Sequence, residues 1–114
     1  MFLPPPSVRI FLCRQPTDMR KSFDSLAALV RDVVLSDPLS GHVFVFKNRG
    51  GDRMKVLWWD RSGFCLLYRR LEEGTYAFPE QKEISAGELA MILEGIDVRD
   101  ATRRKRYILP QRLK

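Results

Sequence analysis

Aromatic and basic side chains alternate through the middle of the sequence, from His42 to Arg70. The stretch HVFVFKNRGGDRMKVLWWDRSGFCLLYRR brings lysines and arginines next to phenylalanines, two tryptophans and Tyr68. Aromatic rings can stack on nucleic-acid bases while cations hold phosphates, so a sheet face with this composition could bind nucleic acid. The alternative is that the rings form the core and the cations extend around its rim. Spacing alone favours that alternative for most of them.

A second group of cations lies at the end of the sequence. The chain has 114 residues and a formal net charge of +6, but residues 1–98 contain 13 basic and 13 acidic side chains. Residues 99–114 contain seven basic side chains and one acidic, so the whole net charge lies in this basic tail. Such a tail suits a phosphate backbone, an acidic partner or an anionic surface, unless it is merely solvated. We expect phosphate contacts from five tail residues: Arg103, Arg104, Lys105, Arg106 and Arg112.

Two further cations stand directly before a predicted helix. Arg20 and Lys21 precede Ser22, the expected N-cap, and there they oppose the helix dipole by roughly a few tenths of a kcal/mol. They would also help to gather an anion at the helix N-terminus. We group them with three cations of the central stretch into a second phosphate-binding patch, with Trp59 as a base-stacking or partner-docking surface. The patch consists of Arg20, Lys21, Arg49, Arg53 and Lys55.

The sequence offers little for catalysis. His42 is the only histidine, which excludes a histidine-dependent catalytic triad and a metal site built from several histidines. The carboxylates that could bind a metal have local explanations at helix ends, in a turn and on an exposed hairpin. The segment NRGGDR lacks the spacing and the following helix of a phosphate-cradling glycine loop. We therefore expect no enzyme, no cofactor and no metal site, and a divalent-metal nuclease is the weakest of three alternatives.

Two cysteines and the start of the chain bear on where the protein works. Cys13 and Cys65 lie inside apolar runs without the spacing of a metal site, so we expect buried free thiols in a reducing compartment. The first ten residues lack the basic segment and the long apolar run of a signal peptide. No segment approaches the ~18 apolar residues of a membrane-spanning helix. The expected location is the cytoplasm.

Hydrophobic periodicity predicts one α+β domain over residues 1–98, followed by the basic tail over 99–114. The domain should contain a small, mostly antiparallel sheet of three to five strands and two helices. An edge strand that ends at Pro79 could complete the sheet. The other expected elements are strands over 8–14, 42–48, 53–60 and 64–71, a helix from Ser22 to Asp37, and a helix that a Ser85–Glu88 capping box starts and Gly95 ends.

The turn between the third and fourth of these strands decides which tryptophan faces which side. Residues 60–63 fit a three-residue hairpin loop that ends in a left-handed glycine. Trp59 would then lie opposite Cys65, and Trp58 opposite Leu66, although a four-residue loop would change these partners. Successive residues of a strand point to opposite faces, so the two indoles cannot share one core. We expect Trp58 in the main core and Trp59 under a thinner layer or at a contact surface.

Three blocks of the sequence resemble one protein family: RIFLCRQPTDMRKSFDSLAALV, GHVFVFKNRGGDRMKVLWWDRSGFCLLYRRLEEGTYAFP and LAMILEGID. They are similar to the TnpB accessory proteins of bacterial insertion sequences of the sixty-six family, which are unrelated to the RNA-guided nucleases of the same name. The resemblance implies a role in DNA transposition beside a separate, larger transposase that carries the catalytic residues. It supplies no catalytic residue to carry over. The positions that match the family's motifs are Asp18, Met19, Arg20, Lys21, Phe46, Asn48, Arg49, Lys55, Trp59, Asp60, Gly63, Arg70 and Leu71.

Two functions follow from these patterns and this resemblance. The first is a non-enzymatic accessory protein that binds nucleic acid, DNA or RNA, in a complex with the transposase. The alternative is an adaptor that binds the transposase through its sheet and never contacts DNA. Either protein could act as a homo-oligomer.

Overall fold

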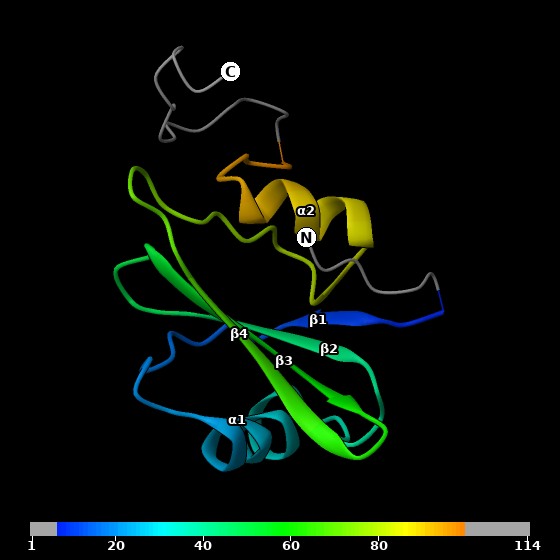
Figure 1. Ribbon diagram of the computed structural model, residues 1–114. Helices are drawn as coiled ribbons and strands as arrows, with labels where there is room; N and C mark the ends of the chain where they lie inside the picture. The colour runs from blue at the N-terminus through cyan, green and yellow to red at the C-terminus, as the bar shows by residue number, and fades with distance from the viewer. Residues whose placement is uncertain (1–6, 100–114) are drawn as a thin grey trace, which may run out of the picture.

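A five-stranded sheet lies between two helical layers in the computed structural model, which describes residues 7–99 (Figure 1). The elements in chain order are β1 (Ile10–Leu12), α1 (Phe23–Leu29), β2 (Val43–Lys47), β3 (Arg53–Asp60), β4 (Gly63–Arg70), β5 (Glu83–Ile84) and α2 (Ala86–Leu93). The strand order across the sheet is β4-β3-β2-β1-β5. β1 and β2 are parallel, and the other neighbouring pairs are antiparallel. The predicted α+β class with a mostly antiparallel sheet and two helices is confirmed.

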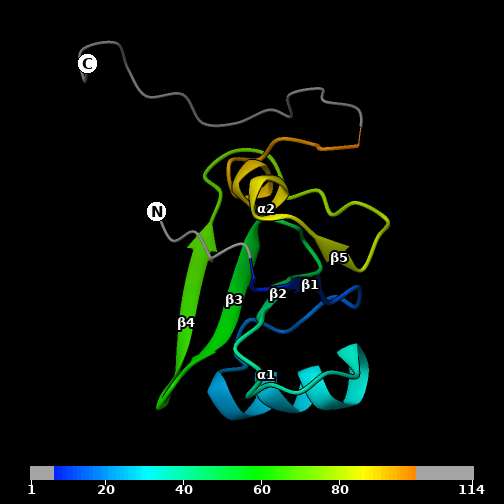
Figure 2. The ribbon, with the colours of Figure 1, turned by 90° about the vertical axis from the view of Figure 1, so that its right-hand side faces the viewer.

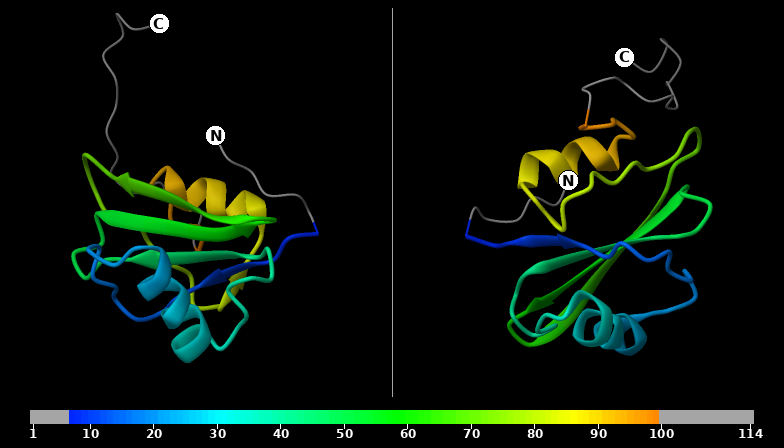
Figure 3. Two further views of the ribbon diagram at one scale, coloured as in Figure 1. Left: turned by 60° about the horizontal axis from the view of Figure 1, so that its bottom comes forward. Right: turned by 180° about the vertical axis from the view of Figure 1, so that it is seen from behind.

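Each face of the sheet is covered by one helix, α1 on one side and α2 on the other (Figures 2 and 3). Strand β3, which lies between β4 and the central strand β2, supplies both cores, because its side chains alternate in direction. Met54 and Val56 belong to the α2-side core, and Leu57 belongs to the α1-side core. The α2-side core also contains Ile10, Leu12, Val43, Val45, Tyr76, Phe78, Ile84, Leu89, Ile92 and Leu93. The α1-side core also contains Cys13, Leu26, Val30, Phe44 and Phe46.

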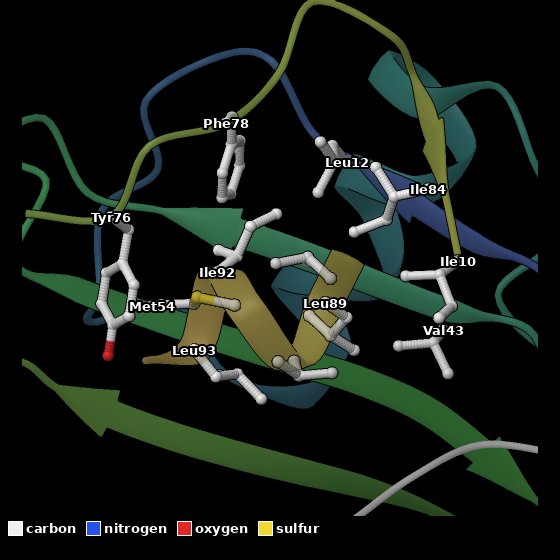
Figure 4. Packing of buried hydrophobic residues seen from close by; sticks show 12 residues of the cluster. Ile10, Leu12, Val43, Met54, Tyr76, Phe78, Ile84, Leu89, Ile92 and Leu93 are labelled. Atoms are coloured by element: carbon white, nitrogen blue, oxygen red, sulfur yellow. The ribbon is translucent and has the colours of Figure 1, made fainter. Parts of the chain in front are cut away.

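Helix α2 starts and packs as its sequence predicts. The Ser85 N–H donates to Glu88 Oε1 at 2.9 Å, and the Glu88 N–H donates to Ser85 Oγ at 3.1 Å, which completes the capping box. The apolar stripe then meets the sheet, and Leu89, Ile92 and Leu93 are at most 1% exposed (Figure 4). Together they place α2 firmly over β1, β2 and β3.

Helix α1 ends earlier than expected. Its last turn widens into a π-helical segment, Val30–Val34, and Leu35 then adopts a left-handed conformation with φ 61° and ψ 48°. The Ser36 N–H donates to Val30 O at 3.0 Å and closes this end. The predicted end at Asp37 is therefore two residues too late, because a left-handed residue stops the helix before the proline does.

We expect Leu35→Gly to stabilise the protein by about 0.5–1 kcal/mol. A left-handed L-residue costs about 1–2 kcal/mol, part of which is offset by the extra freedom of glycine in the unfolded chain. The side chain of Leu35 is 77% exposed, so little packing is lost. Urea denaturation measures the change. Leu39→Gly is the control, because Leu39 is also exposed but has no positive φ, and an equal gain there would contradict the explanation.

β3 and β4 join through a two-residue loop, so the predicted three-residue loop is wrong. Arg61, and not Gly63, has the positive φ, at 60°. The register between the strands is consequently shifted by one residue from the predicted one. The observed pairs include Trp59–Phe64, Trp58–Cys65, Val56–Leu67 and Lys55–Tyr68. Because side chains alternate along a strand, this shift exchanges the two faces of β4 relative to the prediction.

The expected edge strand ending at Pro79 is also wrong. Residues 76–79 are all buried but form no strand in the structure. The Tyr76 N–H donates to Gly51 O at 2.7 Å, so this segment runs beside the β2–β3 connection instead. The fifth strand is β5, which pairs with β1 at the other edge of the sheet.

Candidate nucleic-acid interface

Three connections meet at one end of the sheet: the β1–α1 connection, the β2–β3 loop and the segment after β4 (Figures 1 and 3). Backbone hydrogen bonds join them. The Thr17 N–H donates to Lys47 O at 2.8 Å, and the Leu71 N–H donates to Asp52 O at 2.8 Å. The β2–β3 loop thus lies between the two other connections, and this end of the molecule carries most of the described cations that the sequence singles out.

The β2–β3 loop, residues 48–52, is called the Arg49 loop below and is held in one shape by Asn48. The Arg53 N–H donates to Asn48 Oδ1 at 3.0 Å, and Asn48 Nδ2 donates to Asp52 Oδ1 at 2.9 Å. The bond from Asn48 lowers the pKa of the Asp52 carboxyl. The Gly51 N–H donates back to Asn48 O at 3.1 Å. These bonds leave Arg49 exposed at the tip of a loop whose backbone is ordered before any ligand arrives.

A pocket of about 620 Å³ opens between the Arg49 loop and the β1–α1 connection. We call it the Arg53 pocket. Its polar lining comes from Thr17, Asp18, Asn48, Arg49, Asp52 and Arg53. Of the predicted patch, Arg49 and Arg53 line this pocket and Arg20, Lys21 and Lys55 do not, and the lining contains carboxylates as well as cations.

Arg20 is not a free cation at the rim of this region. Its guanidinium contacts both carboxylate oxygens of Asp18, with Nη2 at 2.7 Å from Oδ2 and Nε at 3.1 Å from Oδ1. Hydrogen bonds from Arg20 lower the pKa of Asp18 to about 2, so the pair stays ionised at neutral pH. Arg20 remains 92% exposed and can reach a second anion only while it shares its charge with Asp18.

A second pocket, of about 330 Å³, opens on the other side of the Arg49 loop. We call it the Lys47 pocket. Its lining includes the cations Lys47, Arg49 and Arg99 and no carboxylate. Lys47 Nζ lies 4.6 Å from the ring centroid of Phe78, which holds the ammonium beside an aromatic face. Lys47 and Arg99 were not among the predicted phosphate contacts, although Lys47 lies in the central stretch of aromatic and basic residues and Arg99 begins the basic tail.

Arg99 is fixed in the Lys47 pocket by the buried carboxylate of Asp97. The Arg99 Nη2 atom lies 2.7 Å from Asp97 Oδ2, and Nε lies 2.9 Å from Oδ1. The basic tail therefore starts from this pocket. Its predicted phosphate contacts, Arg103, Arg104, Lys105, Arg106 and Arg112, lie outside the described residues.

Lys55 points into the protein. Its burial argues against the predicted role as a phosphate contact. The side chain is 6% exposed, and Nζ donates to Lys21 O at 2.6 Å. The same Nζ lies 4.7 Å from the ring centroid of Tyr68. Lys55 thus ties β3 to the start of α1 and supports the surface from beneath. Lys21 is half-buried above it.

Trp59 lies apart from the cations that it was grouped with. It is six residues along β3 from Arg53, or roughly 20 Å at the rise of a strand. There it is half-buried and meets Phe64 edge to face, with centroids 5.0 Å apart. Trp58, on the other face, packs half-buried against the α2-side core instead of at its centre. The structure therefore does not bring Trp59 into the predicted patch.

Tyr68 is the aromatic residue that does lie among these cations. It is 49% exposed, and Arg53 Nη1 donates to its hydroxyl at 3.3 Å. The register predicted from the sequence put Tyr68 on the wrong face, because it paired Tyr68 with Val56 instead of Lys55. A prediction with a two-residue hairpin loop would have put Tyr68 on the face where it lies.

The described residues contain no arrangement that points to catalysis. Across residues 7–99 no group of three histidine, cysteine or carboxylate side chains could hold a metal ion. His42 Nδ1 accepts a hydrogen bond from the Arg9 N–H at 3.0 Å and serves the β1–β2 junction. Cys13 is buried as expected, while Cys65 is half-buried, and neither forms a disulfide. None of the helices in this range is long and apolar enough to span a membrane.

Comparison of the sequence with known proteins identifies the family of this chain. Residues 8–103 match the family model described as IS66 Orf2 like protein. The chain belongs to this family. Two similar proteins come from Sinorhizobium fredii (strain NBRC 101917 / NGR234): Uncharacterized protein y4hO is 40% identical over 97 residues, and Uncharacterized protein y4jC is 36% identical over 101. The alignments cover 82% and 85% of this chain and 84% and 86% of the two relatives. No solved structure matches the chain.

Membership of the IS66 Orf2 family makes this chain an accessory protein associated with transposition. The matched range includes the Arg49 loop, the residues that line both pockets, and the first part of the basic tail. The resemblance of the three sequence blocks to this family is therefore confirmed.

Proposed function

We propose that this IS66 Orf2 protein binds nucleic acid beside the transposase of its element, as a non-enzymatic factor, and that the Arg49 loop and the basic tail form the binding surface. The observation that carries the proposal is Arg49 itself. It is exposed at the tip of a hydrogen-bonded loop and has no ion pair or hydrogen bond among residues 7–99. A guanidinium without a partner, on a loop whose backbone is already ordered, is available to a phosphate.

The pockets on either side of Arg49 support a backbone-binding role. The Lys47 pocket brings three cations together, one of which, Arg99, is paired with Asp97. The Arg53 pocket adds Arg53 to Arg49 on the opposite side of the loop. A sugar–phosphate backbone that crosses the loop would pass from the arginines of the Arg53 pocket, whose lining also includes Asp18 and Asp52, to the Lys47 pocket. Such contacts position a nucleic acid without reading its sequence.

We include the basic tail in the same surface because its first residue, Arg99, lines the Lys47 pocket. Each neutralised phosphate contributes about −0.9 to the log–log salt slope on duplex DNA. Replacing Arg103, Arg104, Lys105, Arg106 and Arg112 together with glutamine should therefore make the slope shallower by about 4 to 5. An unchanged slope would remove the tail from the proposal.

An adaptor that binds only the transposase is the second candidate. The sheet, the surface predicted for it, has a helix over each face (Figure 2), and its edge strand β4 contains no fully buried residue. Another surface favours it: Leu35 and Leu39, between α1 and β2, are 77% and 53% exposed. Two exposed leucines so close in the chain are an apolar surface that a protein partner could cover.

One binding experiment separates the two candidates. The full-length protein is titrated into fluorescein-labelled DNA at ~0.15 M salt, with and without purified transposase. Direct binding that weakens as salt rises supports the proposal. Binding seen only with transposase present supports the adaptor. Cleavage of the DNA that Mg²⁺ or Mn²⁺ stimulates would contradict the non-enzymatic role.

A further inference from the structure

Tyr68 is an exposed aromatic ring whose position is unusually constrained. Lys55 Nζ lies 4.7 Å from its ring centroid, and its hydroxyl accepts a hydrogen bond from Arg53 Nη1 at 3.3 Å. Lys55 is itself buried and anchored on Lys21 O at 2.6 Å. This ammonium lies over one face of the ring, and Tyr68 as a whole is 49% exposed.

This constraint matters for binding. A surface tyrosine normally loses rotamer freedom when a ligand covers it, which lowers affinity. Here the contacts from Lys55 and Arg53 hold the ring before a ligand arrives. A fixed ring with one open face is a platform on which a flat ligand can stack.

Cations surround the platform on the same face of the sheet. Arg53 and Arg70 lie opposite each other on β3 and β4, one pair of positions away on that face from the Lys55–Tyr68 pair. Arg70 shares its charge with Glu72, whose Oε2 lies 3.0 Å from Nε, and Asp52 also lies near both arginines. Within residues 7–99 Arg53 has no hydrogen bond to a carboxylate, and it lines the Arg53 pocket as well. It could hold a phosphate beside a ring that holds a base.

We propose that Tyr68 stacks on an unpaired base while Arg53 contacts the adjoining phosphate, so that this surface prefers single-stranded nucleic acid to duplex. The inference rests on the proposed nucleic-acid binding function and adds the substrate class. Bases inside a duplex are already stacked on both faces and offer only their edges, whereas an unpaired base offers a free face to an aromatic ring. The covered sheet leaves Trp59 half-buried and at the far end of β3.

The test uses full-length protein with Tyr68 replaced by leucine, and by phenylalanine or tryptophan as matched aromatic variants. The probes are a fluorescein-labelled 12-nucleotide oligothymidylate and a 12-base-pair duplex, each measured by anisotropy at one salt concentration. Tyr68→Leu should weaken binding of the single strand by about tenfold and change duplex binding by less than about twofold, because stacking on aromatics is lost only for the unpaired base. Tyr68→Phe and Tyr68→Trp should retain single-strand binding within about threefold.

Two results would overturn the inference. One is a Tyr68→Leu protein that binds the single strand as tightly as the original. The other is an equal loss on both probes, which would indicate a general disturbance of the surface. Thermal unfolding checks that the leucine variant folds, and Tyr68→Thr serves as a second ring-free variant suited to a strand. If the unmodified protein binds neither probe, the proposed function itself fails, so the two failures are distinguishable.

Discussion

Arg49→Glu is expected to weaken nucleic-acid binding by about ten- to a hundredfold at physiological salt. The substitution removes a charge-assisted contact to phosphate, and it places a negative charge at the tip of the loop that the backbone would cross. The slope of log affinity against log salt concentration should become shallower by about 0.9, the contribution of one phosphate contact. The free energy of unfolding should change by less than about 0.5 kcal/mol, because the side chain is exposed and has no partner within residues 7–99.

Arg31→Glu is the control for this prediction. Arg31 is also exposed and lies in the π-helical segment after α1. Its replacement by glutamate changes the net charge of the protein by the same amount. Anisotropy titrations at several salt concentrations compare the two variants. An equal loss from both would show that binding depends on overall charge and would contradict the role of the Arg49 loop.

Gly51→Ala should destabilise the fold by about 1–3 kcal/mol and weaken binding with it. Gly51 is buried, its φ is +81°, and a Cβ there would lie 3.2 Å from Thr75 Cβ. An L-residue in the left-handed region costs about 1–2 kcal/mol before that contact is counted. The contact cannot relax easily, because Tyr76, next to Thr75, donates its N–H to Gly51 O at 2.7 Å. The loop would have to move away from the segment that follows β4.

Gly50→Ala is the matched control, one residue away in the same loop. Gly50 is exposed and has no positive φ, and its Cβ would meet Asp52 Oδ1 at an ordinary 3.5 Å. We expect a change in unfolding free energy of less than about 0.5 kcal/mol and unchanged nucleic-acid binding. Guanidinium denaturation measures both variants. Similar stability for the two would show that the Arg49 loop is not held in the way its hydrogen bonds indicate.

The proposed binding surface is ordered by contacts within the protein itself. Asn48 and the segment after β4 hold the loop from two sides, so Arg49 stands on an ordered backbone. The same principle recurs at Tyr68, which two cations hold in place. Both features lie at the end of the sheet where three connections meet (Figure 1). The basic tail, residues 99–114, could supply charge to this surface but not its shape.

The elements that depend on neighbours in the chain were predictable from the sequence. β3 has the predicted bounds, Arg53–Asp60, because β-branched and aromatic residues between polar turns favour a strand. The α2 capping box uses residues three positions apart, and Gly95 follows the helix with φ +78°. The family resemblance likewise depended on motifs that are contiguous in the sequence. Local geometry and side-chain chemistry suffice for all of these.

By itself, then, the sequence determined the α+β class, the family and the concentration of charge in residues 99–114, whereas the covering of both sheet faces by helices was seen only in the structure. Only the tertiary structure decided which side chains meet. A loop shorter by one residue exchanged the faces of β4 and put Tyr68, rather than Trp59, among the cations. Lys55 was drawn inward to the backbone of Lys21, 34 residues away in the chain. Register and burial depend on contacts between distant segments, and a pattern of neighbouring residues carries no information about them.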